Sequence, residues 1–91
     1  MDVHFPNSPE SVLTIIVAAE RHRKFVWTAG RVLRESALWT RLESLPYSER
    51  KAVLKRLESS LEKLTEQGVL RRRPEVQSIG YGDEIGFDYI V

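Results

Sequence analysis

Cationic side chains are the residues of this sequence whose types and spacing point most directly to chemistry, namely the binding of a polyanion. The chain has 91 residues, with 14 Lys and Arg against 13 Asp and Glu and a net charge of only +1. All of the cations lie between Arg21 and Arg73, whereas the charged side chains of segment 74–91 are all acidic. This segregation predicts a basic face on a nearly neutral molecule, suited to nucleic acid or another acidic partner. Chance clustering on a solvated surface is the alternative.

The cations that matter most form two groups. Segment 50–56 holds four cations and no anion, and it lies in the first two turns of a predicted helix. The helix dipole disfavours positive charge there by about 0.3–1 kcal/mol per exposed residue, so the arrangement indicates a partner. Ion pairs at helical spacing, such as Lys55 with Glu58, offer a competing account worth about 0.2–0.5 kcal/mol each. The second group is the run 71–73, for which pairing with Asp88 is the alternative to phosphate binding.

Other kinds of chemistry find little support in the sequence. Cysteine is absent, and His4 and His22 have no partners at metal-ligand spacing. There is no Gly-x-x-x-x-Gly-Lys loop and no spacing that suggests a catalytic triad. We therefore expect neither an enzyme nor a cofactor or metal. The longest apolar run spans only 15–19, far short of the roughly 20 residues of a membrane helix, and no secretory signal is evident. We expect a cytoplasmic protein.

The first element that must position these cations is a helix capped by Ser8, with Pro9 at its first position. Residues 12–19 are apolar around most of its circumference. A helix with so wide an apolar face is buried by several neighbours or partly by another subunit, so we predict a homodimer through this helix. The competing account is that the other helices and the strands cover it within one chain.

A short strand at 25–27 and a second helix follow. Thr28 caps this helix, which extends to Ser36. The leucines Leu38, Leu42 and Leu45 then form a stripe about 200° away on the helical wheel. The pattern favours a break near Ala37, and continuation of the helix to Leu45 is the alternative.

The third helix spans 49–67, with Ser48 as its cap and Gly68 as its left-handed stop. Its apolar positions follow the helical period, and they are Val53, Leu54, Leu57, Leu61 and Leu64. A hairpin follows, with strands at 69–73 and 85–91 and a loop at 74–84. Ile85, Phe87, Tyr89 and Val91 should share one face of the second strand.

This order of elements, with a leucine-rich helix that leads into Gly68-Val69-Leu70 and three arginines, resembles winged helix-turn-helix domains of bacterial and archaeal regulators. The resemblance implies an α+β, mainly α, fold of three helices with a C-terminal β-hairpin wing. We expect one domain over 1–91, with 1–7 as a flexible N-terminal segment. Two features depart from the pattern. The segment 37–47 is longer than the usual 3–4-residue turn, and Asp83 and Glu84 would repel DNA from the wing.

In that family the third helix is the recognition helix, and its N-terminal half enters the major groove. The resemblance therefore implies a DNA-binding transcriptional regulator with helix 48–67 as recognition helix and hairpin 69–91 as wing. The residues that it nominates for contact with double-stranded DNA are Thr28, Ser48, Arg50, Lys51, Lys55, Arg56, Arg71, Arg72 and Arg73. Lys51 and Lys55 should point away from the core. Arg50 lies on the side of the leucine stripe, so bracing of the second helix is its alternative role, and Thr28 has helix capping as its alternative. The competing function is a winged-helix protein–protein interaction module that binds an acidic partner.

Overall fold

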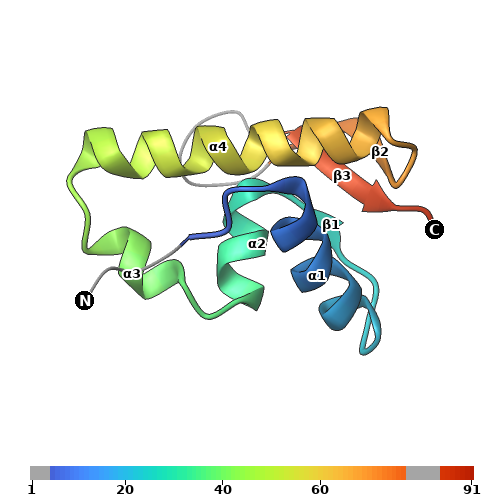
Figure 1. Ribbon diagram of the computed structural model, residues 1–91, viewed down its shortest axis with the longest axis horizontal. Coiled ribbons are helices and arrows are strands. Elements are labelled where there is room, and N and C mark those ends of the chain that lie inside the picture. The colour runs from blue at the N-terminus through green and yellow to red at the C-terminus, as the bar shows by residue number, and fades with distance from the viewer. Residues whose placement is uncertain (1–4, 78–84) are drawn as a thin grey trace.

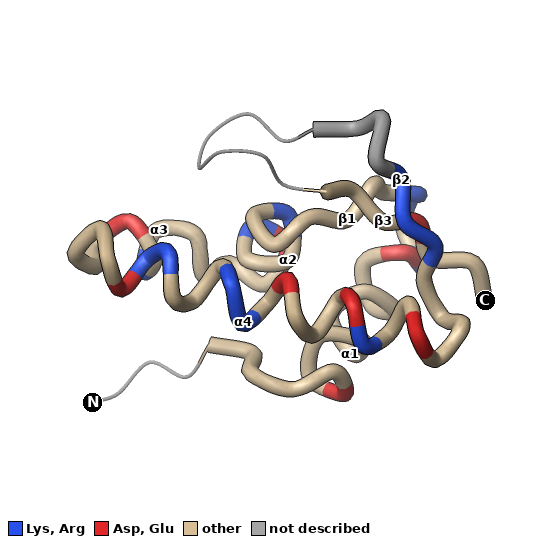
Figure 2. Tube along the Cα trace, turned by 90° about the horizontal axis from the view of Figure 1, so that it is seen from above, with Lys and Arg blue, Asp and Glu red and all other residues tan. Residues whose placement is uncertain are grey.

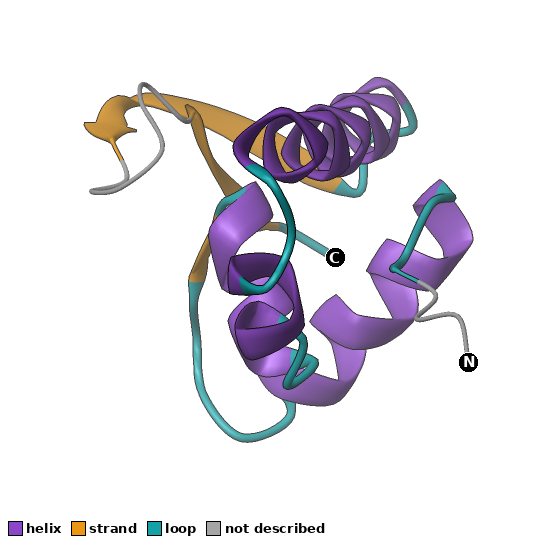
Figure 3. Cartoon of the chain, turned by 90° about the vertical axis from the view of Figure 1, so that its left-hand side faces the viewer, coloured by secondary structure: helices purple, strands orange, loops and turns teal. Residues whose placement is uncertain are grey.

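The computed structural model describes residues 5–77 and 85–91, the side chains of 74–77 excepted. Within these residues the chain forms the helices α1 (Pro9–Glu20), α2 (Ala29–Glu35), α3 (Trp39–Glu43) and α4 (Tyr47–Glu66) and the strands β1 (Val26–Trp27), β2 (Leu70–Gln77) and β3 (Ile85–Tyr89). The predicted α+β, mainly helical fold is confirmed, and its helices followed by a C-terminal hairpin are consistent with a winged helix. The long α4 runs along one side of the molecule, and α1, α2 and α3 lie on the other (Figures 1 and 3).

The periodic leucines of α4 build the core. Val53, Leu54, Leu57, Leu61 and Leu64 are all buried, as their spacing predicts. They join Val12 and Ile16 of α1, Val32 and Leu33 of α2, Leu42 of α3 and Phe87 of β3 in one cluster. α4 contacts α1, α2, α3 and β2. The buried side of α4 makes these contacts, and the opposite side of the helix faces solvent.

Two of the three predicted helix caps are present, and one is wrong. The Ser8 hydroxyl accepts a hydrogen bond from the Ser11 amide, and the Thr28 hydroxyl accepts one from the Arg31 amide. Ser48, however, is not a cap, because α4 begins at Tyr47 and Ser48 already lies inside the helix. Pro46 takes the N-cap position in an extended conformation, and its carbonyl accepts the amide of Arg50 at 3.0 Å. Proline at this position starts the helix without any side-chain cap.

The segment between the second and third predicted helices folds as a short additional helix. α2 ends at Glu35, so the break near Ala37 is confirmed and the alternative of one helix to Leu45 is wrong. Ala37 has a φ of 61°, and the amide of Leu38 bonds to the carbonyl of Leu33 at 2.8 Å. α3 then turns Leu42 into the core, which explains the change of face in the leucine stripe.

The three strands form an antiparallel sheet in the order β1-β3-β2. β1 is one residue shorter than expected, while β2 continues to Gln77, beyond the predicted end at Arg73. The register shifts between Arg73 and Gln77, and β2 is an edge strand, where Pro74, which has no backbone N–H, is tolerated. The predicted loop 74–84 is therefore wrong for residues 74–77, which belong to β2. The remainder of that loop, 78–84, lies outside the described residues.

The second strand of the hairpin ends before Val91. Phe87 is fully buried and Ile85 and Tyr89 are half-buried, but Gly86 and Asp88 between them are buried as well, so burial does not alternate as predicted. Val91 follows the strand and is exposed. Asp88 is also buried, although it alternates with Phe87 and belongs to the other face of the strand.

Glu20, the last residue of α1, forms hydrogen bonds that connect this helix to β1 and the residue before it. One of its carboxylate oxygens accepts hydrogen bonds from the Phe25 amide and from Nε1 of Trp27, both at 3.0 Å. Trp27 is fully buried, so this acid satisfies its ring nitrogen inside the fold. At the N-terminus, residues 1–4 of the expected flexible segment lie outside the described residues, and Phe5 packs partly against the core.

Candidate nucleic-acid interface

The exposed basic surface of α4 lies in the first half of the helix. Ser48, Lys51, Lys55 and Arg56 are all exposed, while Val53, Leu54 and Leu57 of the same turns are buried. Burial of the leucine stripe fixes the rotation of the helix, so these four side chains point away from the core. Figure 2 shows basic residues along the first half of α4 and mainly acidic ones along the second. We call Ser48, Lys51, Lys55 and Arg56 the α4 basic group.

Arg50 does not share this surface. It is half-buried, and its Nε donates a hydrogen bond to the carbonyl of Leu45 at 2.8 Å. Leu45 lies in the turn between α3 and α4, so Arg50 stabilises the start of α4. This contact supports the alternative role of Arg50 as a brace, here of the turn that leads into α4.

Tyr47 extends the α4 basic group at its N-terminal end. Its side chain is 61% exposed, and Nζ of Lys51 lies 5.6 Å from the centre of its ring. A cation near an exposed aromatic ring gains about 0.5–1 kcal/mol. Tyr47 is not among the residues predicted from the sequence. Its position directly after Pro46, before the leucine stripe begins, is the signal that could have identified an aromatic residue outside the core.

Thr28 acts as the N-terminal cap of α2. Its side chain is buried, and its hydroxyl accepts the Arg31 amide at 3.1 Å. The next cations along α2 also have partners within the chain. Arg31 contacts Glu35 at 3.3 Å, and Arg34 lies 4.6 Å from the centre of the Trp39 ring. Arg34, which is exposed beside an aromatic residue of α3, is not among the residues predicted from the sequence.

The three arginines at the start of β2 are divided between the two faces of the strand. Arg71 and Arg73 both reach Asp88 on β3, at 3.3 and 3.4 Å. Arg72 points the other way and forms an ion pair with Glu62 of α4. The hydrogen bond to this carboxylate and its negative charge raise the pKa of the Arg72 guanidinium. The expected alternative of pairing with Asp88 is thus present for two of the three arginines.

The nominated residues therefore do not form one continuous patch. Lys51 and Glu62, the partner of Arg72, are eleven residues apart on α4, which is about 16 Å along the helix axis at 1.5 Å per residue. Glu58 and Glu62 lie between the α4 basic group and the end of the helix. Arg72 is the member of the β2 run that packs beside α4, whereas Arg71 and Arg73 belong to the opposite side of the hairpin.

Comparison with known proteins adds no family to this description. The chain matches no protein-family model, no curated protein and no solved structure. Among its described residues, no helix is long and apolar enough to cross a membrane, and no three potential metal-ligating side chains lie together.

Proposed function

We propose that the protein binds double-stranded DNA and regulates transcription, with the α4 basic group as its principal contact surface. The observation that carries this proposal is the exposure of Lys51, Lys55 and Arg56 on one helix whose opposite side forms the core. Between Glu49 and Glu58 this helix carries cations and no acidic residue, so phosphate groups would meet a surface of one sign of charge. A helix with side chains is about 10–12 Å wide, which fits the roughly 12 Å major groove of B-DNA.

The distribution of charge along α4 restricts how the helix could lie on DNA. Glu58, Glu62 and Glu66 follow the basic group, and phosphates would repel them. The N-terminal half of α4 therefore enters the groove, while the C-terminal half leaves it. Ser48 and Tyr47 supply hydroxyl groups at the same end of the helix as Lys51.

The test is a fluorescence anisotropy titration with random duplex DNA over a range of salt concentrations. Contact with about four to six phosphates gives a slope of log affinity against log salt near −4 to −5, since each contact contributes about −0.9. A protein that binds duplex with a flat salt response, or not at all at low salt, would contradict the proposal. That result would favour the competing function of a protein-interaction module.

A further inference from the structure

A cleft of about 570 Å³ lies across the sheet, and its lining residues do not belong to α4. Its lining comes from three places in the chain, namely the segment at 24–26, the start of β2 and the end of β3. The register of the sheet brings them together, because Asp88 pairs with Val26 of β1 on one side and with Arg71 of β2 on the other. Binding sites for small molecules have volumes of about 300–1,000 Å³, so the cleft has room for one.

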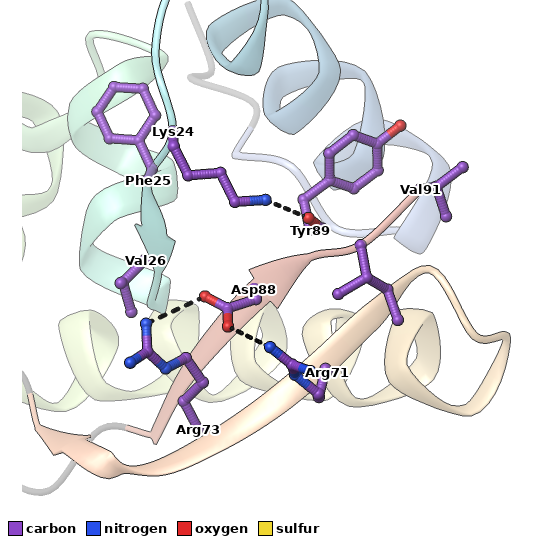
Figure 4. A pocket seen from close by; sticks show the side chains of 9 residues that line it. Lys24, Phe25, Val26, Arg71, Arg73, Asp88, Tyr89 and Val91 are labelled. Atoms are coloured by element: carbon purple, nitrogen blue, oxygen red, sulfur yellow. Dashed lines mark hydrogen bonds and ion pairs between the residues drawn. The ribbon is translucent and has the colours of Figure 1, made fainter.

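Cations surround a buried acid in this cleft. The side chain of Asp88 is only 10% exposed, and Arg71 and Arg73 both reach it. On the opposite wall, Nζ of Lys24 donates a hydrogen bond to the carbonyl of Tyr89 (Figure 4). Nζ of Lys24 also lies 3.6 Å from the carboxylate of Glu20. Arg71, Arg73 and Lys24 thus bring three cations to the cleft.

The two acids are largely buried, and two of the cations that contact them are exposed. The side chains of Arg71 and Lys24 are 69% and 64% exposed, whereas those of Asp88 and Glu20 are each 10% exposed. Asp88 holds one end of the Arg71 guanidinium, and the exposed remainder is directed to solvent. A guanidinium fixed in this way is suited to bind the oxygens of a carboxylate or phosphate.

The cleft also has an apolar part. Val26 lines it from β1, and Ile90, which is 50% exposed, lines it from the end of β3. Few large apolar side chains are this exposed in the described part of the chain. A ligand that covered Ile90 would gain the free energy of removing its surface from water.

We propose that this cleft binds a small organic anion, that is, a carboxylate or phosphate monoester with a short apolar body. Arg71 and Lys24 bind the anionic group, and Val26 and Ile90 contact the apolar part. This site is separate from the proposed DNA-binding surface and does not depend on it. In this site Arg71 binds a small anion rather than a phosphate of DNA.

Phenyl phosphate is a suitable probe, and its binding to the full chain can be measured by calorimetry without DNA. We expect saturable binding with a Kd of about 1 mM or tighter, the range of a weak specific complex. Inorganic phosphate should bind at least several-fold more weakly, because it lacks the apolar body, and benzyl alcohol should not bind measurably. Equal affinity for phenyl phosphate and inorganic phosphate would overturn the organic part of the proposal, and no saturation with either would overturn the site.

Two neighbouring arginines provide a matched pair of variants. Arg71→Gln should weaken phenyl phosphate binding about tenfold, the usual effect of losing a charge-assisted hydrogen bond. Arg72→Gln removes the same charge from the next residue but on the other face of β2, so it should leave the Kd unchanged. Asp88 retains Arg73 in the first variant, and a thermal melt of each variant checks that the fold is intact. Equal losses in the two variants would show that only net charge matters and would overturn the site.

Discussion

Lys51 and Lys55 are the residues on which the DNA-binding proposal depends most. Both are exposed on α4, on the side opposite the buried leucines. Lys51 contacts the exposed ring of Tyr47. Each therefore adds little to the core, and this separation of roles makes it possible to remove binding without unfolding the protein.

We predict that Lys51→Ala combined with Lys55→Ala lowers duplex affinity about tenfold or more, which corresponds to about 1.4 kcal/mol. Stability should change by no more than about 0.5 kcal/mol per residue, as is usual for surface substitutions. Loss of the Tyr47 contact lowers stability slightly. Anisotropy and thermal melts measure the two effects. A smaller salt slope indicates phosphate contact, and reduced sequence discrimination indicates contact with bases.

Two controls accompany this double variant. Arg21→Ala combined with Lys63→Ala removes the same charge from exposed positions outside the α4 basic group, and it should reduce affinity much less. Leu57→Ala should cost about 2–5 kcal/mol of stability by leaving a cavity, and binding should fall only through unfolding. A double lysine variant that binds duplex as tightly as the parent would show that this part of α4 is not the DNA-binding surface.

At the scale of the elements, α2 and α4 end in the same way. Ala37 follows α2 with φ 61°, and Gly68 follows α4 with φ 81°. In each case the next amide bonds back five residues, from Leu38 to Leu33 at 2.8 Å and from Val69 to Leu64 at 3.0 Å. This bond satisfies a carbonyl in the last turn, as in a Schellman motif. Only Gly68 has the residue type that this conformation favours.

The difference between these two helix ends gives a reciprocal prediction. Ala37→Gly should raise the free energy of unfolding by about 0.5–1 kcal/mol, because relief of left-handed strain exceeds the entropy that glycine adds to the unfolded chain. Gly68→Ala should lower it by about 1 kcal/mol through strain alone, since a Cβ there meets no atom within 4 Å. Urea denaturation measures both. If Ala37→Gly destabilised the protein, the left-handed conformation of Ala37 would be excluded.

At the scale of the whole molecule, α1 is only partly covered by its own chain. Val12 and Ile16 are fully buried, but Leu13 and Val17 are half-buried and Ala18 is exposed. The latter three line a shallow pocket of about 420 Å³ on the outside of the helix. The other elements thus account for part of the wide apolar face of α1, and the remainder supports the predicted dimer through this helix.

We predict a dimer at tens of micromolar that Val17→Glu dissociates, because the change places a charge in the centre of the apolar surface. Sedimentation over a range of concentrations measures this association. Ser59→Glu, an exposed change on α4, should leave the association unchanged. A parent protein that sediments near 10.5 kDa at every concentration would rule the dimer out.

Local patterns in the sequence determined much of this fold. The caps at Ser8 and Thr28, the break at Ala37, the left-handed Gly68 and the buried leucines of α4 each depend on residues within about five positions of one another. The spacing of apolar residues fixes which side of a helix is buried, so the outward direction of Lys51 and Lys55 could also be predicted. The error at Ser48 is local too, since Pro46 and Ser48 were both able to start the helix.

Only the tertiary structure decided which distant residues meet. The pairing of β1 with β3 brings Val26 opposite Asp88, and the hairpin register brings Asp88 to Arg71 and Arg73. Packing of β2 beside α4 brings Arg72 to Glu62. No spacing in the chain encodes these contacts, because they depend on strand register and on the relative placement of whole elements. For that reason the sequence grouped Arg71, Arg72 and Arg73 as one basic run, and the fold directs Arg71 and Arg73 to the cleft and Arg72 to α4.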